Sequence, residues 1–337
     1  MANRLTPALI LACLGVVASI HGEARIRWII HDLQHMPDPG SPEVFAMTMD
    51  DLGTKWMGTK KGISRLSQQG DWQVFTTKST QGGLKSDAVT SLAIGDNRDL
   101  WVGTEGGGVS VYSNGAWKNY TVQNTGGGLP DNWVTSLAIR KDEKWFGTRN
   151  GFAMLRGSSW TTYTGEKISG RLPNKMVTAI ALDSNGDKWI GTIAGLARLS
   201  GSSWTVMTRE STGGGLPHNS VACLAVSPKS QKWVGTQMGL ARLADGVWTS
   251  FKQEAGLGEM AGEQVYSLSA AGGNGVWAAI KGGAARLEGT SWTLYTKNNT
   301  TGIQTKFVYA VMPGPGGEVW FGTQKGVSQL IPLPLDE

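Results

Sequence analysis

The sequence predicts an all-β protein folded as a seven-bladed β-propeller of four-stranded antiparallel blades. A Trp-x-Gly-Thr motif recurs every 43 to 45 residues, with one degenerate copy, and a second tryptophan follows six of the seven copies after 15 or 16 residues. A valine precedes each copy by 11 or 12 residues. A period of about 40 to 50 residues is typical of propellers. The motif tryptophans are Trp56, Trp101, Trp145, Trp189, Trp233, Trp277 and Trp320. The preceding valines are Val44, Val89, Val134, Val177, Val221, Val265 and Val308.

The third repeat shows how one blade is built. Residues 134–139, 144–148, 152–156 and 160–164 form four β-rich runs, separated by short segments of Gly, Asn, Asp and Ser. Four antiparallel strands joined by tight hairpins make one blade. The first run carries apolar residues on both faces, as expected for a sheet packed between two neighbouring blades. The repeated tryptophans are therefore expected to fill the gaps between blades.

The N-terminus is predicted to close the ring. No second tryptophan follows Trp320, whereas Trp28 precedes Trp72 by 44 residues, one full period. Residues 26–30 should therefore form the outer strand of the blade whose three inner strands are C-terminal, which removes a free sheet edge. The predicted propeller covers residues 25–331, between a signal peptide over 1–24 and a short tail over 332–337.

The first residues are typical of an export signal. A short positive segment ends at Arg4, an apolar run extends from Leu5 to Ile20, and small residues follow. This predicts a periplasmic or extracellular protein. Anchoring through an uncleaved signal, or through a lipid on Cys13, remains an alternative. No other apolar run is long enough to predict a further transmembrane span.

Charge and cysteine content exclude some functions. The net charge is +5, and the lysines and arginines are scattered singly, which disfavours nucleic-acid binding. Cys223 lies in an apolar strand and would be the single thiol of a processed chain, so we expect a buried small side chain rather than a nucleophile.

Two longer motifs recur within the repeat: Gly-Leu-Pro-x-Asn-x-Val at residues 128–134 and 215–221, and Trp-x-Gly-Thr-x-x-Gly-Leu at 189–196 and 233–240. With these motifs the full repeat resembles the two-component regulator propeller repeat. The resemblance covers residues 26 to 331. It implies a periplasmic ligand-sensing domain, and because the sequence contains no kinase core, the signal would pass to a separate membrane sensor kinase.

Streptogramin-lyase-like propellers are a second family to weigh. Their chemistry needs a catalytic histidine, and this chain has only four, His21, His31, His35 and His218. His31 takes the place of a tyrosine in its repeat and is expected to pack, whereas His218 lies in a Gly-Leu-Pro-His-Asn loop. No nucleophile elbow, metal-binding motif or phosphate loop is present, so no catalytic residue, metal or cofactor is predicted. The segment 183–187 is interpreted as a hairpin rather than a calcium loop.

Ligand-binding residues are expected in two sets of loops that converge at one end of the central channel. Both sets are mostly polar and differ between repeats. Residues two before the landmark valine are Pro42, Asp87, Asn132, Lys175, Asn219, Glu263 and Lys306. Residues after the motif threonine or its counterpart are Lys60, Glu105, Arg149, Ile193, Gln237, Lys281 and Gln324. Trp133 and His218 are also candidates. Phe307 is the counterpart of Trp133 in another repeat, so an aromatic side chain at this position can also be explained by packing alone.

These observations favour a non-enzymatic, exported binding module that recognises a small polar ligand such as an oligosaccharide at the channel mouth. A lyase or hydrolase using the same mouth, and a protein-interaction scaffold, are the alternatives.

Overall fold

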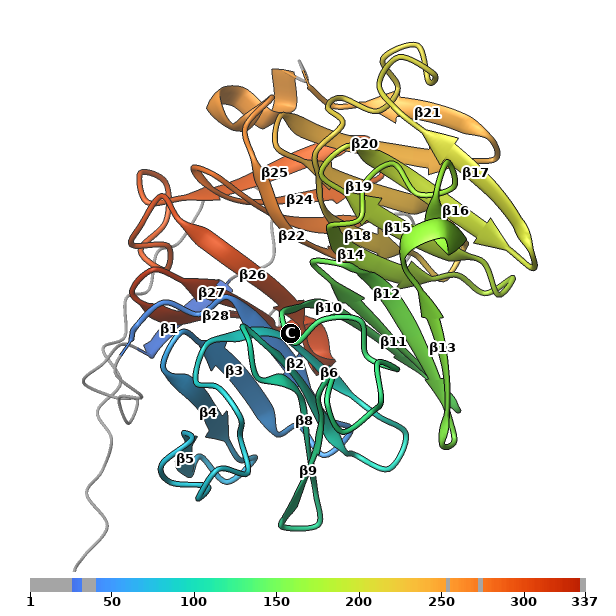
Figure 1. The fold of residues 1–337 in the computed structure, drawn as a ribbon. Coiled ribbons are helices and arrows are strands. Elements are labelled where there is room, and N and C mark those ends of the chain that lie inside the picture. The colour runs from blue at the N-terminus through green and yellow to red at the C-terminus, as the bar shows by residue number, and fades with distance from the viewer. Residues whose placement is uncertain (1–25, 32–40, 253–254, 272–274, 334–337) are drawn as a thin grey trace, which may run out of the picture.

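The computed structural model describes residues 26–31, 41–252, 255–271 and 275–333, and these form a seven-bladed β-propeller (Figure 1). Each blade is one four-stranded antiparallel sheet. The predicted signal peptide, Cys13, His21 and His35 lie outside the described residues. The predicted fold class is therefore confirmed.

The strands fall into four equivalent sets from the channel outwards. The innermost strands are β2 (Ala46–Met49), β6 (Val89–Ile94), β10 (Val134–Arg140), β14 (Val177–Leu182), β18 (Val221–Val226), β22 (Val265–Ala270) and β26 (Val308–Pro313). The second strands are β3 (Lys55–Thr59), β7 (Leu100–Thr104), β11 (Glu143–Thr148), β15 (Lys188–Thr192), β19 (Lys232–Thr236), β23 (Val276–Ile280) and β27 (Val319–Thr323). The third strands are β4 (Gly62–Leu66), β8 (Gly108–Ser113), β12 (Gly151–Arg156), β16 (Gly195–Ser200), β20 (Gly239–Ala244), β24 (Gly283–Glu288) and β28 (Gly326–Pro332).

The outer strands are β5 (Trp72–Phe75), β9 (Ala116–Tyr120), β13 (Ser159–Tyr163), β17 (Ser203–Met207), β21 (Val247–Ser250), β25 (Ser291–Thr296) and β1 (Ile26–His31). Three short 3-10 helices lie in connections: η1 (Gly165–Ile168), η2 (Ala255–Met260) and η3 (Pro315–Gly317). Because strands alternate in direction within each blade, two kinds of connection meet on one face. These are the hairpins between second and third strands and the links from an outer strand to the next inner strand. We call this the channel-mouth face.

The motif glycine of one blade packs directly against the landmark valine of the next blade. A Cβ atom added to Gly191 would lie 2.6 Å from Cγ1 of Val221 in the next blade, and one added to Gly147 would lie 2.8 Å from Cγ1 of Val177. Both valines are fully buried. Glycine at this position therefore lets the blades approach closely, which explains why the two landmarks recur together.

The motif tryptophans fill the gaps between blades, as predicted. All seven are at most 5% exposed. Each buried cluster joins adjacent sheets, as where Trp233 of β19 packs with Val276 and Leu287 of the next blade. The second tryptophans cover the Gly-Leu segment of the preceding link, so that Gly128 faces the indole of Trp160.

The two ends of the chain share one blade. Its strand order is β1-β28-β27-β26, and β1 pairs antiparallel with β28, with Trp28 opposite Leu330. His31 stacks on Trp320 with ring centroids 5.3 Å apart. The N-terminal strand thus closes the ring at the position predicted from the spacing between Trp28 and Trp72.

Candidate ligand site at the channel mouth

The first residue after each landmark valine occupies a special position on the innermost strand. In six blades the strand register shifts at this residue, as between Val134 and Ser136, which marks a β-bulge. A bulge redirects the extra side chain away from the regular sheet pattern. Because the innermost strands surround the channel and begin on the channel-mouth face, this side chain lies at the rim of the channel.

Threonines occupy this position in three consecutive blades, where they connect neighbouring blades. The hydroxyl groups of Thr90, Thr135 and Thr178 each donate to the carbonyl oxygen of the landmark valine in the next blade, at 2.6, 2.7 and 2.7 Å. We call these three residues the threonine arc. Their hydroxyl groups are engaged in hydrogen bonds that join neighbouring blades.

Aromatic side chains occupy the same position in three other blades. Tyr309 contacts Phe45 on one side and Tyr266 on the other, with ring centroids 4.8 and 5.4 Å apart. Phe307, at the end of the link that leads into β26, adds a fourth ring, with its centroid 6.1 Å from that of Tyr309. All four rings are half-buried. We call Phe45, Tyr266, Phe307 and Tyr309 the aromatic arc; Ala222 stands between it and the threonine arc.

The aromatic arc is flanked by two ion pairs. The ammonium group of Lys60 lies over the Phe45 ring, 5.5 Å from its centroid, and pairs with Glu105 of the next blade. On the other flank Lys281 pairs with Glu263 at 2.9 Å, and this contact raises the pKa of the lysine. Burial raises the pKa of the Tyr266 hydroxyl above its usual value, so this group stays protonated at neutral pH.

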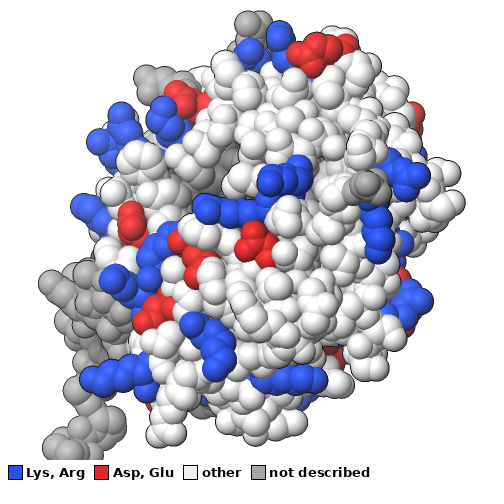
Figure 2. All heavy atoms as spheres, in the orientation of Figure 1, with Lys and Arg blue, Asp and Glu red and all other residues white. Residues whose placement is uncertain are grey.

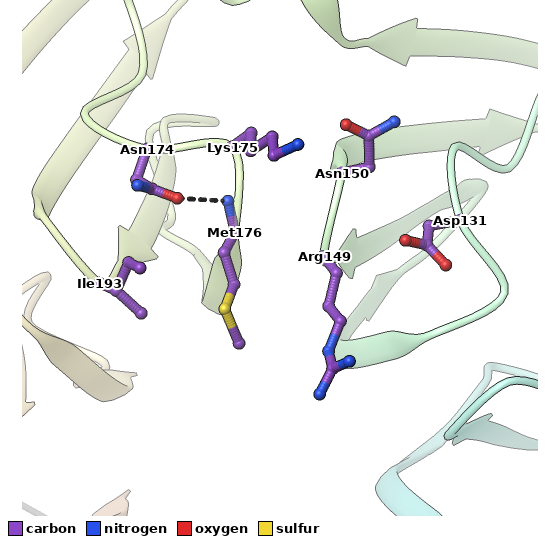
Figure 3. Close-up of a pocket in the computed structure, with 7 residues that line it drawn as sticks. All are labelled: Asp131, Arg149, Asn150, Asn174, Lys175, Met176 and Ile193. Carbon is purple, nitrogen blue, oxygen red and sulfur yellow. Dashed lines mark hydrogen bonds between the residues drawn. The ribbon is translucent and has the colours of Figure 1, made fainter.

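A pocket of about 680 Å³ lies between the blade of β10–β13 and the blade of β14–β17. The guanidinium of Arg149 stacks on Trp133, with its central carbon 3.1 Å from the ring centroid. Figure 3 shows the Lys175 side chain directed towards Asn150 across this pocket. The lining residues come from four loops and are Asp131, Arg149, Asn150, Asn174, Lys175, Met176 and Ile193 (Figure 3).

A second pocket of about 410 Å³ lies on the same face, beside the blade of β22–β25. It brings together three predicted site residues, Glu263, Lys281 and Lys306, against an apolar wall that includes Leu257 and Met260. Basic and acidic side chains are interspersed on the face drawn in Figure 2, without a large region of one sign.

Several predicted site residues instead hold their own loops. The side chains of Asp87, Asn132 and Asn219 each accept a backbone N–H ten residues earlier, at 2.6, 2.8 and 2.6 Å. Nδ1 of His218 accepts the backbone N–H of Ser220 at 2.9 Å. Asn174 makes the same turn with Met176, so His218 serves as a turn residue of a repeated type.

The aromatic arc and the amides Asn150 and Asn174 were not among the residues predicted from the sequence. A signal for the arc exists: the residue after the landmark valine is threonine in three repeats and aromatic in three others. Interpreting it requires knowing that this position is a bulge at the channel rim, and the repeat pattern alone does not show that.

The carboxylates of the Asp183–Asp187 hairpin serve the fold. Asp183 accepts the Trp189 indole N–H at 3.2 Å and lies 3.4 Å from the Lys232 ammonium, while Asp187 pairs with Arg198 at 2.5 Å. Burial by itself would raise the pKa of Asp183, but these hydrogen bonds and the nearby lysine lower it below its usual value. Within the described part of the chain, no group of three His, Cys, Asp or Glu residues is placed to hold a metal.

Cys223 is an inert structural thiol. Its sulfur packs beside Gly235 and lies 3.8 Å from the carbonyl oxygen of Val265. Burial of the sulfur raises the pKa of this thiol far above its usual value, so the reactive thiolate does not form at neutral pH.

The chain matches no protein-family model and no curated protein sequence. Among solved structures, it is similar to the extracellular domains of two putative hybrid two component systems from B. thetaiotaomicron. The TM-scores are 0.73 and 0.68 at 20% and 18% identity, over 87% of this chain and 39% of each of those chains. It is also similar to virginiamycin B lyase from Staphylococcus aureus, with a TM-score of 0.69 at 16% identity over 92% of this chain and all (100%) of that one.

At these identities the likeness shows a shared fold. The chain spans about two fifths of the length of the two-component proteins that it matches. Structural neighbours thus include extracellular domains of putative two component systems and a lyase. Among the described residues, no helix has the length and apolar character needed to cross a membrane.

Proposed function

We propose that this protein is an exported, non-enzymatic propeller that binds a small polar ligand, such as an oligosaccharide, at the channel mouth. In this proposal a separate membrane sensor kinase reads the occupancy of the site. The likeness to extracellular domains of two-component proteins supports the sensing role. The channel rim is asymmetric, with aromatic side chains on one part and threonines on another. This asymmetry is the observation on which we base the location of the binding region.

The aromatic arc supplies what a sugar ring needs. Half-exposed aromatic rings stack on the apolar C–H face of a pyranose, and the hydroxyls of Tyr266 and Tyr309 add polar groups. Neither of these hydroxyls hydrogen-bonds to another described residue, so both are available to a ligand. The flanking ion pairs, Lys60–Glu105 and Lys281–Glu263, offer donors and acceptors for sugar hydroxyls.

The test is binding of the full-length protein to a glycan array, followed by titration calorimetry with the best ligand. Tyr309→Leu keeps apolar volume but removes the ring, and we expect it to weaken binding at least tenfold. Val247→Ala is the matched control, because Val247 is 66% exposed on a hairpin of the opposite face. Equal affinities of wild type and Tyr309→Leu, with unchanged thermal stability, would contradict the proposed site.

The likeness to virginiamycin B lyase makes a lyase the second candidate. His218→Asn separates the two functions, because asparagine makes the same turn at residue 174 but cannot act as a general base near neutral pH. If the protein consumes its ligand and this variant retains binding but loses turnover, the non-enzymatic proposal is wrong. Intact ligand recovered from wild type after prolonged incubation supports binding without catalysis.

A further inference from the structure

Positive charge at the channel mouth is distributed unevenly. Lys60 and Lys281 are neutralised by glutamates, as described above. Arg149 and Lys175 form no ion pair with any described carboxylate. These two cations come from neighbouring loops and face the same pocket, between the blade of β10–β13 and the blade of β14–β17.

The guanidinium of Arg149 is held in place before any ligand binds. Its central carbon lies 3.1 Å from the centroid of the Trp133 ring, a contact that restrains the group, and its N–H groups form no hydrogen bond with another described residue. Lys175 extends across the pocket towards the amide of Asn150 (Figure 3). In Figure 3 the Arg149 guanidinium and the Lys175 ammonium are directed to different parts of the pocket, and each can donate charge-assisted hydrogen bonds to a carboxylate or a sulfate.

One carboxylate, Asp131, also lines this pocket. Its Oδ1 accepts the backbone N–H of Trp133 at 2.8 Å, which commits that oxygen to the turn. The pocket therefore carries two cations against one anion. The side chains of Met176 and Ile193, the latter 44% exposed, add apolar surface beside the charged groups. Such surface suits the ring or methyl carbons that carry an anionic substituent.

We propose that this pocket binds an anionic group, a carboxylate or a sulfate ester, on the saccharide ligand, so that the protein selects acidic over neutral saccharides. This inference rests on the proposed function, because it names the charge class of the same ligand. It adds a second contact region to the mouth, independent of the aromatic arc.

The experiment uses the full-length protein and a glycan array that includes neutral, uronic-acid-bearing and sulfated oligosaccharides. We expect the bound set to consist of acidic members, and comparing uronate with sulfate arms identifies the anionic group. The best acidic ligand and its carboxyl-reduced or desulfated counterpart are then titrated against wild type and variants. Arg149→Gln and Lys175→Gln should each weaken binding of the acidic ligand at least tenfold and of the neutral counterpart less than twofold.

Lys229→Gln is the charge-matched control, since Lys229 is exposed on a hairpin of the opposite face and its loss changes the net charge equally. Binding confined to neutral glycans would overturn this inference and leave the proposed function standing. Acidic ligands that bind equally to Arg149→Gln, Lys175→Gln and Lys229→Gln would overturn the assignment to this pocket. Failure to bind any glycan would overturn both proposals.

Discussion

Removing the Trp28 indole tests whether the N-terminal strand closes and stabilises the ring. The side chain is 8% exposed and packs against Phe321 and Tyr295, with ring centroids 5.6 and 6.0 Å away. A buried tryptophan covers about 150–250 Å², and replacing one with alanine costs about 3–5 kcal/mol of unfolding free energy. For a chain of about 300 ordered residues with an unfolding entropy of about 2.1 cal/mol/K per residue, this lowers the melting temperature by about 5–8 °C.

The assay is calorimetric or circular-dichroism melting of wild type, Trp28→Ala and Trp248→Ala. Trp248 is the matched control, because it occupies the equivalent position on β21, an outer strand within a continuous blade. We expect both variants to melt cooperatively at lower temperature. If the melting temperature falls in Trp248→Ala but is unchanged in Trp28→Ala, the reasoning is refuted, because closure by β1 would then not stabilise the ring.

Three further predictions concern the scaffold. Gly128→Ala places a Cβ 2.5 Å from Cγ of the Trp160 indole and should cost about 1–3 kcal/mol in denaturant unfolding; an unchanged midpoint would show that this contact relaxes freely. Thr135→Val leaves the Val177 carbonyl without its hydroxyl donor and should cost about 1 kcal/mol, and an equal or higher stability would contradict the role of the threonine arc. Because the folded pKa of Asp183 is lowered, its carboxylate stabilises the protein above about pH 4, and this contribution is lost as pH falls through the folded pKa. Unfolding free energies of wild type and Asp183→Asn should therefore differ by about 1–3 kcal/mol at pH 7 and converge in acid, whereas a constant difference would count against this assignment.

The repeat pattern was sufficient to predict the blades because each landmark has a local physical role repeated seven times. The four strands predicted for residues 134–164 match β10–β13 to within a residue or two at each end. The closing strand was predicted because Trp28 obeys the same period. Hydrophobic spacing and turn residues act over a few residues, so they can be seen in one sequence.

The candidate site was only partly predictable. The variable loop positions lie on the channel-mouth face, and Arg149 and Lys175 line one pocket there. The same reasoning could not separate them from Asp87, Asn132 and Asn219, whose polar side chains hold their own loops. In the sequence, a polar loop residue looks the same whether it is available to a ligand or holds its own loop. Only the position of its hydrogen-bond partner distinguishes the two roles.

By itself, therefore, the sequence determined the number of blades, their strand order and the way in which the ring closes, because those features follow from a periodic pattern of local contacts. The tertiary structure decided which side chains meet at the channel. Phe45 and Tyr309 are more than 260 residues apart in sequence, yet ring closure places them in contact. The aromatic arc exists because the first and last innermost strands become neighbours, and that juxtaposition is a property of the closed ring.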